Sequence, residues 1–252
     1  MPSLFSATSI GNPFTELAAV DSTNNYAMAQ ALQSTANHGH AWFAWRQTAG
    51  KGSRGKSWSA ADGQNIILSV LLSPSPLVSG HSFYLSAAVA LATYDFFNSF
   101  AGNDTSIKWP NDIYWRDRKA AGILIENNMR GNTWQWAVAG MGVNINQTEF
   151  NASINNPVSL KQITGKTYDI VAMAKKLCDC LQVRYEQLQR DRETILQDYN
   201  AVLYKKGETV KLKKNNAVFN CIIKEVNAFG QLEIADAPQS HVEFGEVEWI
   251  IR

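Results

Sequence analysis

Residues 42–72 read WFAWRQTAGKGSRGKSWSAADGQNIILSVLL, and this stretch decides between two classes of fold. Residues 50–57 match the phosphate-binding P-loop pattern, G-x-x-x-x-G-K-[ST]. A P-loop must open directly into a helix, because the helix N-terminus holds the phosphates. Here the turn signal Asp62-Gly63 follows, and then the short, apolar, partly β-branched run 66–72, which predicts a buried strand. The P-loop match is therefore interpreted as a coincidence.

The loop itself still carries a chemical signal, because glycines alternate with cations from Gly50 to Lys56. Glycine permits positive φ and close backbone approach, and cations beside bare N–H groups form an anion site. This pattern predicts a loop that wraps a carboxylate or a phosphate. A solvated basic turn between two strands stays open as the alternative.

Composition places the chain among ordinary globular proteins: 252 residues, 45% hydrophobic, 18% charged, with a formal net charge of +1. This length favours one large domain and a small one. The small net charge argues against a general nucleic-acid or membrane-surface role. No apolar run approaches the ~18 residues of a membrane span, and the first residues lack the features of a signal peptide.

Three cysteines and four histidines are scattered along the chain without the spacing of a zinc site or a disulfide framework. Cys178 and Cys180 lie two apart on an expected helix and so point to different faces. Free thiols, no structural metal and a reducing cytoplasmic location are the expectations.

The order of elements predicts an α+β fold with a mixed or antiparallel sheet, since many short strands have few helices between them. Strands are expected at residues 14–20, 41–46, 66–72, 107–109, 113–115, 119–126 and 134–139. Helices are expected at residues 26–32, 81–100, after a Thr167 cap, and at 192–203. Residues 207–252 hold only short strands and turns, which predicts a small β-barrel that leans on a main domain of residues 1–206.

Polar residues gather at the turn between the strands near residue 110. Lys108, Asn111 and Asp112 flank a Pro-Asn-Asp turn, and Lys119 stands at the start of the next strand, before small residues. This placement lets a ligand dock against backbone beside a lysine. A plain β-turn and a surface lysine are the simpler interpretations.

Five blocks in this order closely resemble the signature of the biotin protein ligases. They are Asp21-Ser-Thr-Asn24, Gln47–Trp58, Lys108-Trp-Pro-Asn-Asp112, Lys119-Ala-Ala-Gly-Ile-Leu-Ile-Glu126 and Gly140-Met-Gly-Val-Asn-Ile-Asn146. The tail, with Gly230-Gln-Leu232 and Phe244-Gly-Glu-Val247, is similar to the C-terminal part of that family. The resemblance covers about residues 15 to 252.

The resemblance implies a catalytic domain akin to class II aminoacyl-tRNA synthetases, followed by an SH3-like barrel. It implies that biotin and ATP, with Mg²⁺, form biotinyl-5′-AMP. A lysine of a biotin carboxyl carrier domain, in acetyl-CoA carboxylase or a related carboxylase, then takes the biotinyl group. Joining two anions requires cations and N–H groups that offset their repulsion.

The same resemblance implies roles for individual residues. The catalytic groups are Lys119, Lys51, Asp112 and Lys108. The biotin site comprises Ser22, Thr23, Asn24, Gln47, Lys51, Gly52, Ser53 and Lys119. The ATP and adenylate site comprises Lys51, Ser53, Lys56, Trp58, Asn111, Asp112, Lys119 and Asn144. Trp58, Gly122 and Ile123 share the apolar wall, and Mg²⁺ arrives with ATP near Asp112 and is not held by the protein alone.

This chain departs from the family pattern in the basic loop. Much of the family has arginine at the positions of Lys51 and Lys56, and often at that of Ser53. Lysine keeps the charge but loses bidentate geometry, and serine keeps neither. The loop is therefore expected to hold the adenylate less tightly.

Only about twenty residues precede the first block, so we expect a monofunctional enzyme without a DNA-binding domain. Monomers and homodimers both occur in the family, and the sequence leaves both open. A lipoate or octanoate ligase or transferase of the same fold is the alternative function. A biotin-sensing or nucleic-acid-binding regulator is a non-enzymatic one, although neither a DNA module nor a basic face is visible.

Overall fold

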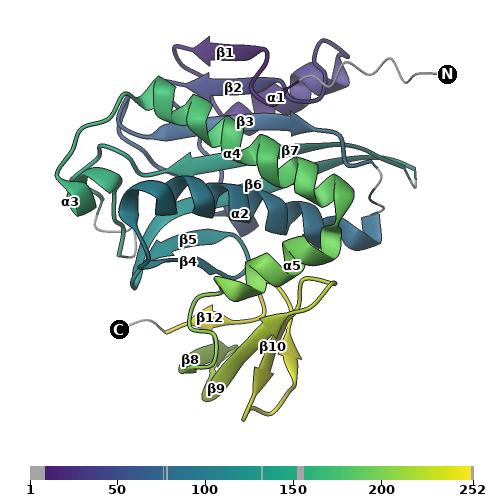
Figure 1. Ribbon diagram of the computed structural model, residues 1–252, viewed down its shortest axis with the longest axis vertical. Helices are drawn as coiled ribbons and strands as arrows, with labels where there is room; N and C mark the ends of the chain where they lie inside the picture. Colours follow the sequence, from purple (N-terminus) through teal and green to yellow (C-terminus); the bar gives the residue numbers. More distant parts are fainter. Residues whose placement is uncertain (1–8, 76, 78, 132, 152–155, 251–252) are drawn as a thin grey trace.

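The computed structural model describes residues 9–75, 77, 79–131, 133–151 and 156–250, arranged around two β-sheets (Figure 1). The larger sheet has seven strands in the order β1-β2-β3-β7-β6-β5-β4. Its strands are β1 (Phe14–Leu17), β2 (Ala41–Ala44), β3 (Ile66–Leu72), β4 (Thr105–Lys108), β5 (Asp112–Trp115), β6 (Arg118–Arg130) and β7 (Thr133–Val143). Strands β1 and β2 run parallel and the other neighbours antiparallel, so the expected mixed sheet is confirmed.

Helices cover both faces of this sheet. They are α1 (Thr23–Leu32), α2 (Ser82–Ala101), α3 (Leu160–Thr164), α4 (Ile170–Arg190) and α5 (Arg192–Ala201), with short 3₁₀ turns η1 (Ser53–Gly55) and η2 (Ser79–His81). Helices α2 and α4 lie across one face (Figure 1). Helix α2 is buried on most sides, which its apolar sequence dictates, whereas α4 buries a single stripe.

Alternation along the strands separates two cores. Leu68, Val70 and Leu72 of β3 belong to the large core that contains α2 and α4. Leu71 points the other way and joins a smaller core with Ala27 and Ala31 of α1. Successive strand residues face opposite sides of a sheet, so both faces of β3 are apolar and the strand is buried throughout, as its sequence predicted.

Two local expectations need correction. Helix α4 is capped by Asp169, whose carboxylate accepts from the backbone N–H of Ala172 at 3.0 Å. Thr167 lies too far upstream to reach that first turn. The first strand ends at Leu17, and Val20 forms only an isolated bridge with Gln47.

Two short elements were not anticipated from the sequence. Helix α3 has five residues and is stabilised by a capping box between Ser159 and Gln162. Strand β11 (His241–Val242) has two residues. Elements this short span less than two periods of the hydrophobic pattern, so periodicity cannot reveal them.

The C-terminal strands form the second sheet, in the order β11-β10-β9-β8-β12. The remaining strands are β8 (Thr209–Lys214), β9 (Ala217–Val226), β10 (Leu232–Ala235) and β12 (Glu248–Trp249). This five-stranded antiparallel sheet occupies the place expected for the small barrel. Its apolar residues continue the large core. Asn200 of α5 exchanges two hydrogen bonds with the Val226 backbone, at 2.7 and 2.8 Å.

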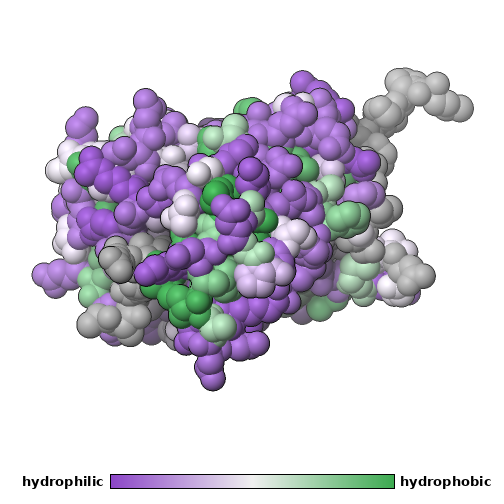
Figure 2. All heavy atoms as spheres, turned by 90° about the horizontal axis from the view of Figure 1, so that it is seen from below, coloured by the Kyte–Doolittle hydropathy of each residue, from purple (hydrophilic) through white to green (hydrophobic). Residues whose placement is uncertain are grey.

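Figure 2 shows the molecule from below the view of Figure 1. This face is mostly hydrophilic, with a limited hydrophobic area near its middle. Phe229 and Phe244 are exposed large hydrophobic residues of the C-terminal part. Phe244 packs edge-to-face on Trp109, whose indole N–H donates to the Gly230 carbonyl at 2.9 Å. The second sheet therefore contacts the turn that carries Asn111 and Asp112.

Candidate functional site

A pocket opens on the α1 face of the large sheet, over its central strands β3, β7 and β6. It encloses about 650 Å³ of space, part of it open to solvent. Gly140 and Gly142 pair with Ser69 and Ile67 of β3, so the alternation of the strands puts them on the same face. The absence of side chains at these glycines leaves room for Asn24, which packs on Gly140, and for Trp58, which packs on Gly142.

The indole of Trp58 lies at one end of this pocket. A Cβ atom at Gly142 would lie 2.3 Å from the indole, and one at Gly122 would lie 3.0 Å from it. The two glycines are register partners on β7 and β6. A pair of facing glycines therefore admits the ring and makes it a wall of the pocket. The buried Nε1 of the indole has no hydrogen-bond partner among the residues that the structure describes.

The opposite end of the pocket is polar. Gln47 Oε1 accepts from the Thr23 backbone N–H at 2.8 Å and lies 3.3 Å from the Thr23 hydroxyl. Ser22 caps helix α1, its hydroxyl oxygen accepting from the Asn25 backbone. The Ser22 O–H and the Gln47 amide N–H₂ have no acceptor among the described residues, so both are available to a ligand.

A lysine–carboxylate pair lies at the mouth of β6. Lys119 Nζ is 2.7 Å from Asp112 Oδ1, and both side chains are partly buried. Asn111 is fixed beside them, because its Nδ2 donates to the Ile123 carbonyl at 2.7 Å. A bulge in the β5–β6 pairing between Ile113 and Tyr114 shifts the register here. Bulges commonly redirect side chains next to binding sites.

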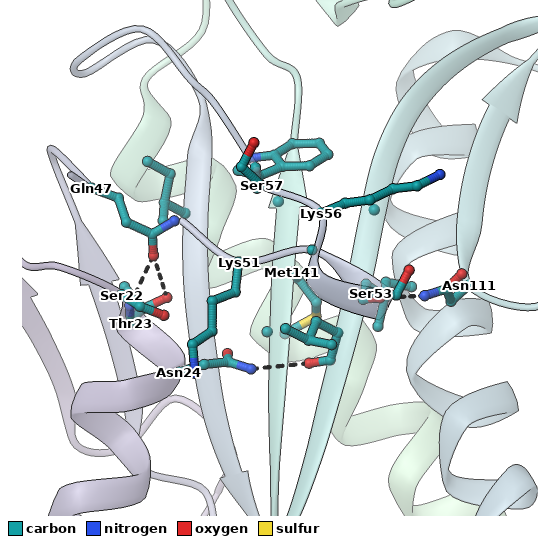
Figure 3. Close-up of a pocket in the computed structure, with 18 of the residues that line it drawn as sticks. Ser22, Thr23, Asn24, Gln47, Lys51, Ser53, Lys56, Ser57, Asn111 and Met141 are labelled. Carbon is teal, nitrogen blue, oxygen red and sulfur yellow. Dashed lines mark hydrogen bonds between the residues drawn. The ribbon is translucent and has the colours of Figure 1, made fainter. Parts of the chain in front are cut away.

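The basic loop folds over the pocket (Figure 3). The backbones of Lys51 and Ser57 form an isolated antiparallel β-bridge, and the Gly52 N–H donates to the Lys56 carbonyl at 2.7 Å. These contacts hold the two ends of the loop together. Arg54 at its tip has a φ of 57°. No helix follows the loop before β3, so the P-loop interpretation is excluded.

The pocket brings together all but two of the site residues expected from the sequence. Its lining includes Ser22, Thr23, Asn24, Gln47, Lys51, Gly52, Ser53, Lys56, Trp58, Asn111, Asp112, Lys119, Gly122 and Ile123. Of the other lining residues, Ser57, Leu124, Gly140, Met141 and Gly142 belong to the signature blocks but had been given no role, and Ile67 and Leu68 lie outside the blocks. The period-2 pattern of β3, β6 and β7 could have indicated several of these once strand register was known.

Lys108 does not line the pocket. Its ammonium lies between the rings of Tyr114 and Trp249, 5.1 and 5.5 Å from their centroids. Burial lowers the pKa of Lys108 to about 8, although the Asp112 carboxylate acts in the opposite direction. Lys108 thus sits behind Asp112, at the junction with the second sheet.

Asn144 does not line the pocket either. Its Nδ2 donates to the Val158 carbonyl at 3.1 Å and to the Lys119 carbonyl at 3.4 Å. The side chain is buried, and its contacts hold the strand mouth from which Lys119 projects. This geometry makes Asn144 a support for Lys119.

Within the described parts of the chain, no group of three or more His, Cys, Asp or Glu side chains could hold a metal ion. No helix in the same parts has the length and apolar character needed to cross a membrane.

Comparison with known proteins shows which protein family the sequence matches. Residues 16–144 match the model of the biotin/lipoate A/B protein ligase family. The bifunctional ligase/repressor BirA of Bacillus spizizenii is 33% identical over 144 residues, 56% of this chain and 44% of that protein. A biotin–[acetyl-CoA-carboxylase] ligase of Paracoccus denitrificans is 34% identical over 160 residues, 61% of this chain and 65% of that protein.

The fold has been seen before. The biotin protein ligase of Aquifex aeolicus, solved with biotin and ATP, superposes with a TM-score of 0.78. The two chains are 23% identical, and the match covers 94% of this chain and 98% of the other. The chain spans about half the length of the first curated relatives that it matches.

Proposed function

Because this chain belongs to the biotin/lipoate A/B protein ligase family, we propose that it activates biotin with ATP and transfers it to a protein lysine. The observation that carries the proposal is the layout of a single pocket. Its lining joins the polar residues Ser22, Thr23 and Gln47 with two cations, Lys51 and Lys119, and with the apolar indole of Trp58. This layout suits a ligand with a polar ring, an aliphatic chain and an acid group.

The polar end favours biotin over lipoate or octanoate. A ureido ring has two N–H donors and one carbonyl acceptor, which match Thr23, Gln47 and Ser22. The Ser22 O–H and the Gln47 N–H₂ would donate to the ring carbonyl. A dithiolane or an alkyl terminus would leave these groups without partners, at a cost of about 1–3 kcal/mol for each buried group.

Two reactions follow from this placement. The carboxylate oxygen of biotin attacks the α-phosphorus of ATP, and pyrophosphate leaves. The amine of an acceptor lysine then attacks the carbonyl carbon of the mixed anhydride, and AMP leaves. Lys51 and Lys119 bind the anionic oxygens and offset their repulsion, which is how preorganised charges lower such barriers.

Asp112 and Asn111 would lie at the phosphate end, where MgATP enters as substrate. Asp112 holds Lys119 in place by the 2.7 Å contact. Trp58 would contribute an apolar surface to the adenylate, and Ser53 and Lys56 polar contacts from the loop. Lys108 and Asn144 would not touch the substrates. Lys108 would act through Asp112, and Asn144 would act through Lys119.

The acceptor that we propose is the biotin carboxyl carrier domain of an acetyl-CoA carboxylase or a related carboxylase. The name of the Paracoccus relative supports this choice. We also propose that residues 1–206 form the catalytic domain and residues 207–252 a small C-terminal domain. The second sheet begins at Thr209 and contacts the Trp109 turn, which supports a role for it beside the nucleotide or the acceptor.

Mass spectrometry of a carrier domain incubated with the protein, biotin and MgATP tests the proposal. The wild type should add one biotinyl group to one lysine. Lys119→Ala should slow the reaction about a hundredfold, the typical effect of removing one charge-stabilising donor. The exposed Lys211 of β8 provides a matched control, since Lys211→Ala should keep the full rate.

Pyrophosphate release with each acid separates the two candidate substrates. Release with biotin but not with lipoate or octanoate supports the biotin assignment. The reverse result would replace it with the lipoate alternative, and a fully active Lys119→Ala variant would refute the assignment of that lysine.

A further inference from the structure

Lys51 is paired with a carboxylate that no role described above uses. Its Nζ lies 3.3 Å from Glu126 Oε1, across 75 residues of sequence. Glu126 belongs to β6, and it follows Gly122 and Leu124 at alternate positions. Alternation puts all three on the pocket face of the sheet. The carboxylate therefore stands beside the pocket, within reach of the loop that covers it.

A buried side chain of α1 fixes the position of Glu126. Asn24 Nδ2 donates to Glu126 Oε2 at 2.9 Å and to the Leu124 carbonyl at 3.3 Å. Asn24 Oδ1 accepts from the Ser69 hydroxyl at 2.6 Å. With both amide hydrogens engaged, Asn24 has no free donor for a ligand. It is better described as a positioning residue for Glu126.

The surrounding strand leaves Asn24 no freedom to move away. A Cβ atom at Gly140 would lie 2.2 Å from Asn24 Oδ1, so the amide packs directly on the backbone of β7. Glu126 is thus held toward the pocket by a rigid partner. Lys51, in contrast, sits on a loop and is more than one-third exposed, so it is the mobile member of the pair.

The lysine reaches across the pocket from the loop toward Asn24 (Figure 3). An acid that enters the pocket brings a negative charge close to Glu126 and to Lys51 together. Like charges at this distance repel, while Lys51 can neutralise either carboxylate. The acid must therefore compete with Glu126 for the same ammonium.

We propose that Glu126 is the resting counter-ion of Lys51, and that the carboxylate of the substrate replaces it on binding. In the free protein Glu126 keeps the loop drawn over the pocket. On binding, Lys51 transfers from Glu126 to the entering acid. The inference rests on the proposed function, because it assumes a substrate whose acid group reaches Lys51.

Glu126→Gln tests this directly, because glutamine keeps the shape and the oxygen that accepts from Asn24. Biotin should bind about two- to fivefold more tightly to the variant, the range expected for a partly exposed ion pair. Biotinamide, which lacks the charge, should bind equally well to both proteins. The exposed Glu225 of β9 gives the matched control, Glu225→Gln, which should change neither affinity.

A second measurement needs no biotin. Trypsin cleaves after Lys51, Arg54 and Lys56, so its rate in the free protein reports the freedom of the loop. Glu126→Gln should be cleaved faster than wild type, and Glu225→Gln at the wild-type rate. In a Lys51→Gln background, Glu126→Gln should raise biotin affinity by less than in the wild type, because only the direct repulsion between the two carboxylates is then removed.

The results distinguish the two proposals. Unchanged or weaker biotin binding by Glu126→Gln, or an equal gain for biotinamide, overturns the counter-ion role while biotinylation by the wild type still stands. Unchanged trypsin cleavage overturns it as well. A wild type that binds no biotin would refute the proposed function. It would also refute the counter-ion role of Glu126, because that role assumes that an acid binds in the pocket.

Discussion

The indole of Trp58 lies against the backbone of Gly142, so closely that a Cβ atom there would be 2.3 Å from the ring. The contact joins the end of the basic loop to the middle of the sheet. It shows that the wall of the pocket depends on a residue without a side chain.

Gly142→Ala should therefore push Trp58 out of its recess. We expect the KM for ATP to rise at least tenfold, because the indole no longer lines the part of the pocket proposed for the nucleotide. Steady-state kinetics with varied MgATP would measure this. Gly80→Ala is the matched control, since a Cβ atom at Gly80 meets nothing within 4 Å. Equal KM values for the two variants would contradict the assigned wall.

Asn144→Ala should lower the free energy of unfolding by about 1–3 kcal/mol, because it leaves the Val158 carbonyl without the Asn144 amide donor. It should also lower kcat, since Lys119 loses its support. Urea unfolding and initial rates measure the two effects. A raised KM for ATP with unchanged stability would instead indicate direct contact between Asn144 and the nucleotide.

Ser53→Arg should slow the dissociation of biotinyl-5′-AMP about tenfold. Ser53 lines the pocket, and a guanidinium there would add charge-assisted, bidentate hydrogen bonds to the phosphate. Stopped-flow measurement of adenylate release, with Ser53→Lys for comparison, would detect the change. Identical release rates for wild type and Ser53→Arg would show that the loop does not limit dissociation.

Lys108 should make stability depend on pH above neutrality. Burial lowers its pKa from 10.5 to about 8 in the folded protein. Between these values the unfolded chain binds more protons than the folded one, so the free energy of unfolding rises with pH over this interval. Below pH 8 the Lys108 ammonium is charged in both the folded and the unfolded protein, so the full cost of burying the charge lowers the free energy of unfolding.

Urea unfolding between pH 7 and 10 would measure this rise as the difference between wild type and Lys108→Met. The difference should favour the wild type increasingly as pH rises. Lys211→Met, at an exposed position of β8, should show no such trend. A difference independent of pH would mean that Lys108 is not buried as described.

Much of the architecture followed from local sequence signals. The buried strand at residues 66–72, the long helix from residue 82 and the change to short strands after residue 207 all appear where the apolar pattern predicted them. The amphipathic stripe of α4 was also predicted, but its cap was not. Asp169 and Thr167 are both good capping residues, and only the helix start decides between them.

The candidate site was less complete in the sequence. Its motifs were recognisable as a family signature, and the pocket contains every residue that was given a site role except Lys108 and Asn144. Those two side chains turn toward Trp249 and toward Val158, contacts that depend on how distant segments pack. Glu126 ended a motif block in the sequence, yet nothing there indicated that Lys51 would be its partner.

The sequence alone determined the kinds of element, their order and the chemical character of the basic loop, because propensity and periodicity act over a few neighbouring residues. The tertiary structure decided which side chains meet. The pairing of β6 with β7 places Gly122 opposite Gly142 and opens the recess for Trp58. The same register turns Glu126 toward Asn24 and Lys51. A shift of one residue in that pairing would turn each of these groups to the other face of the sheet.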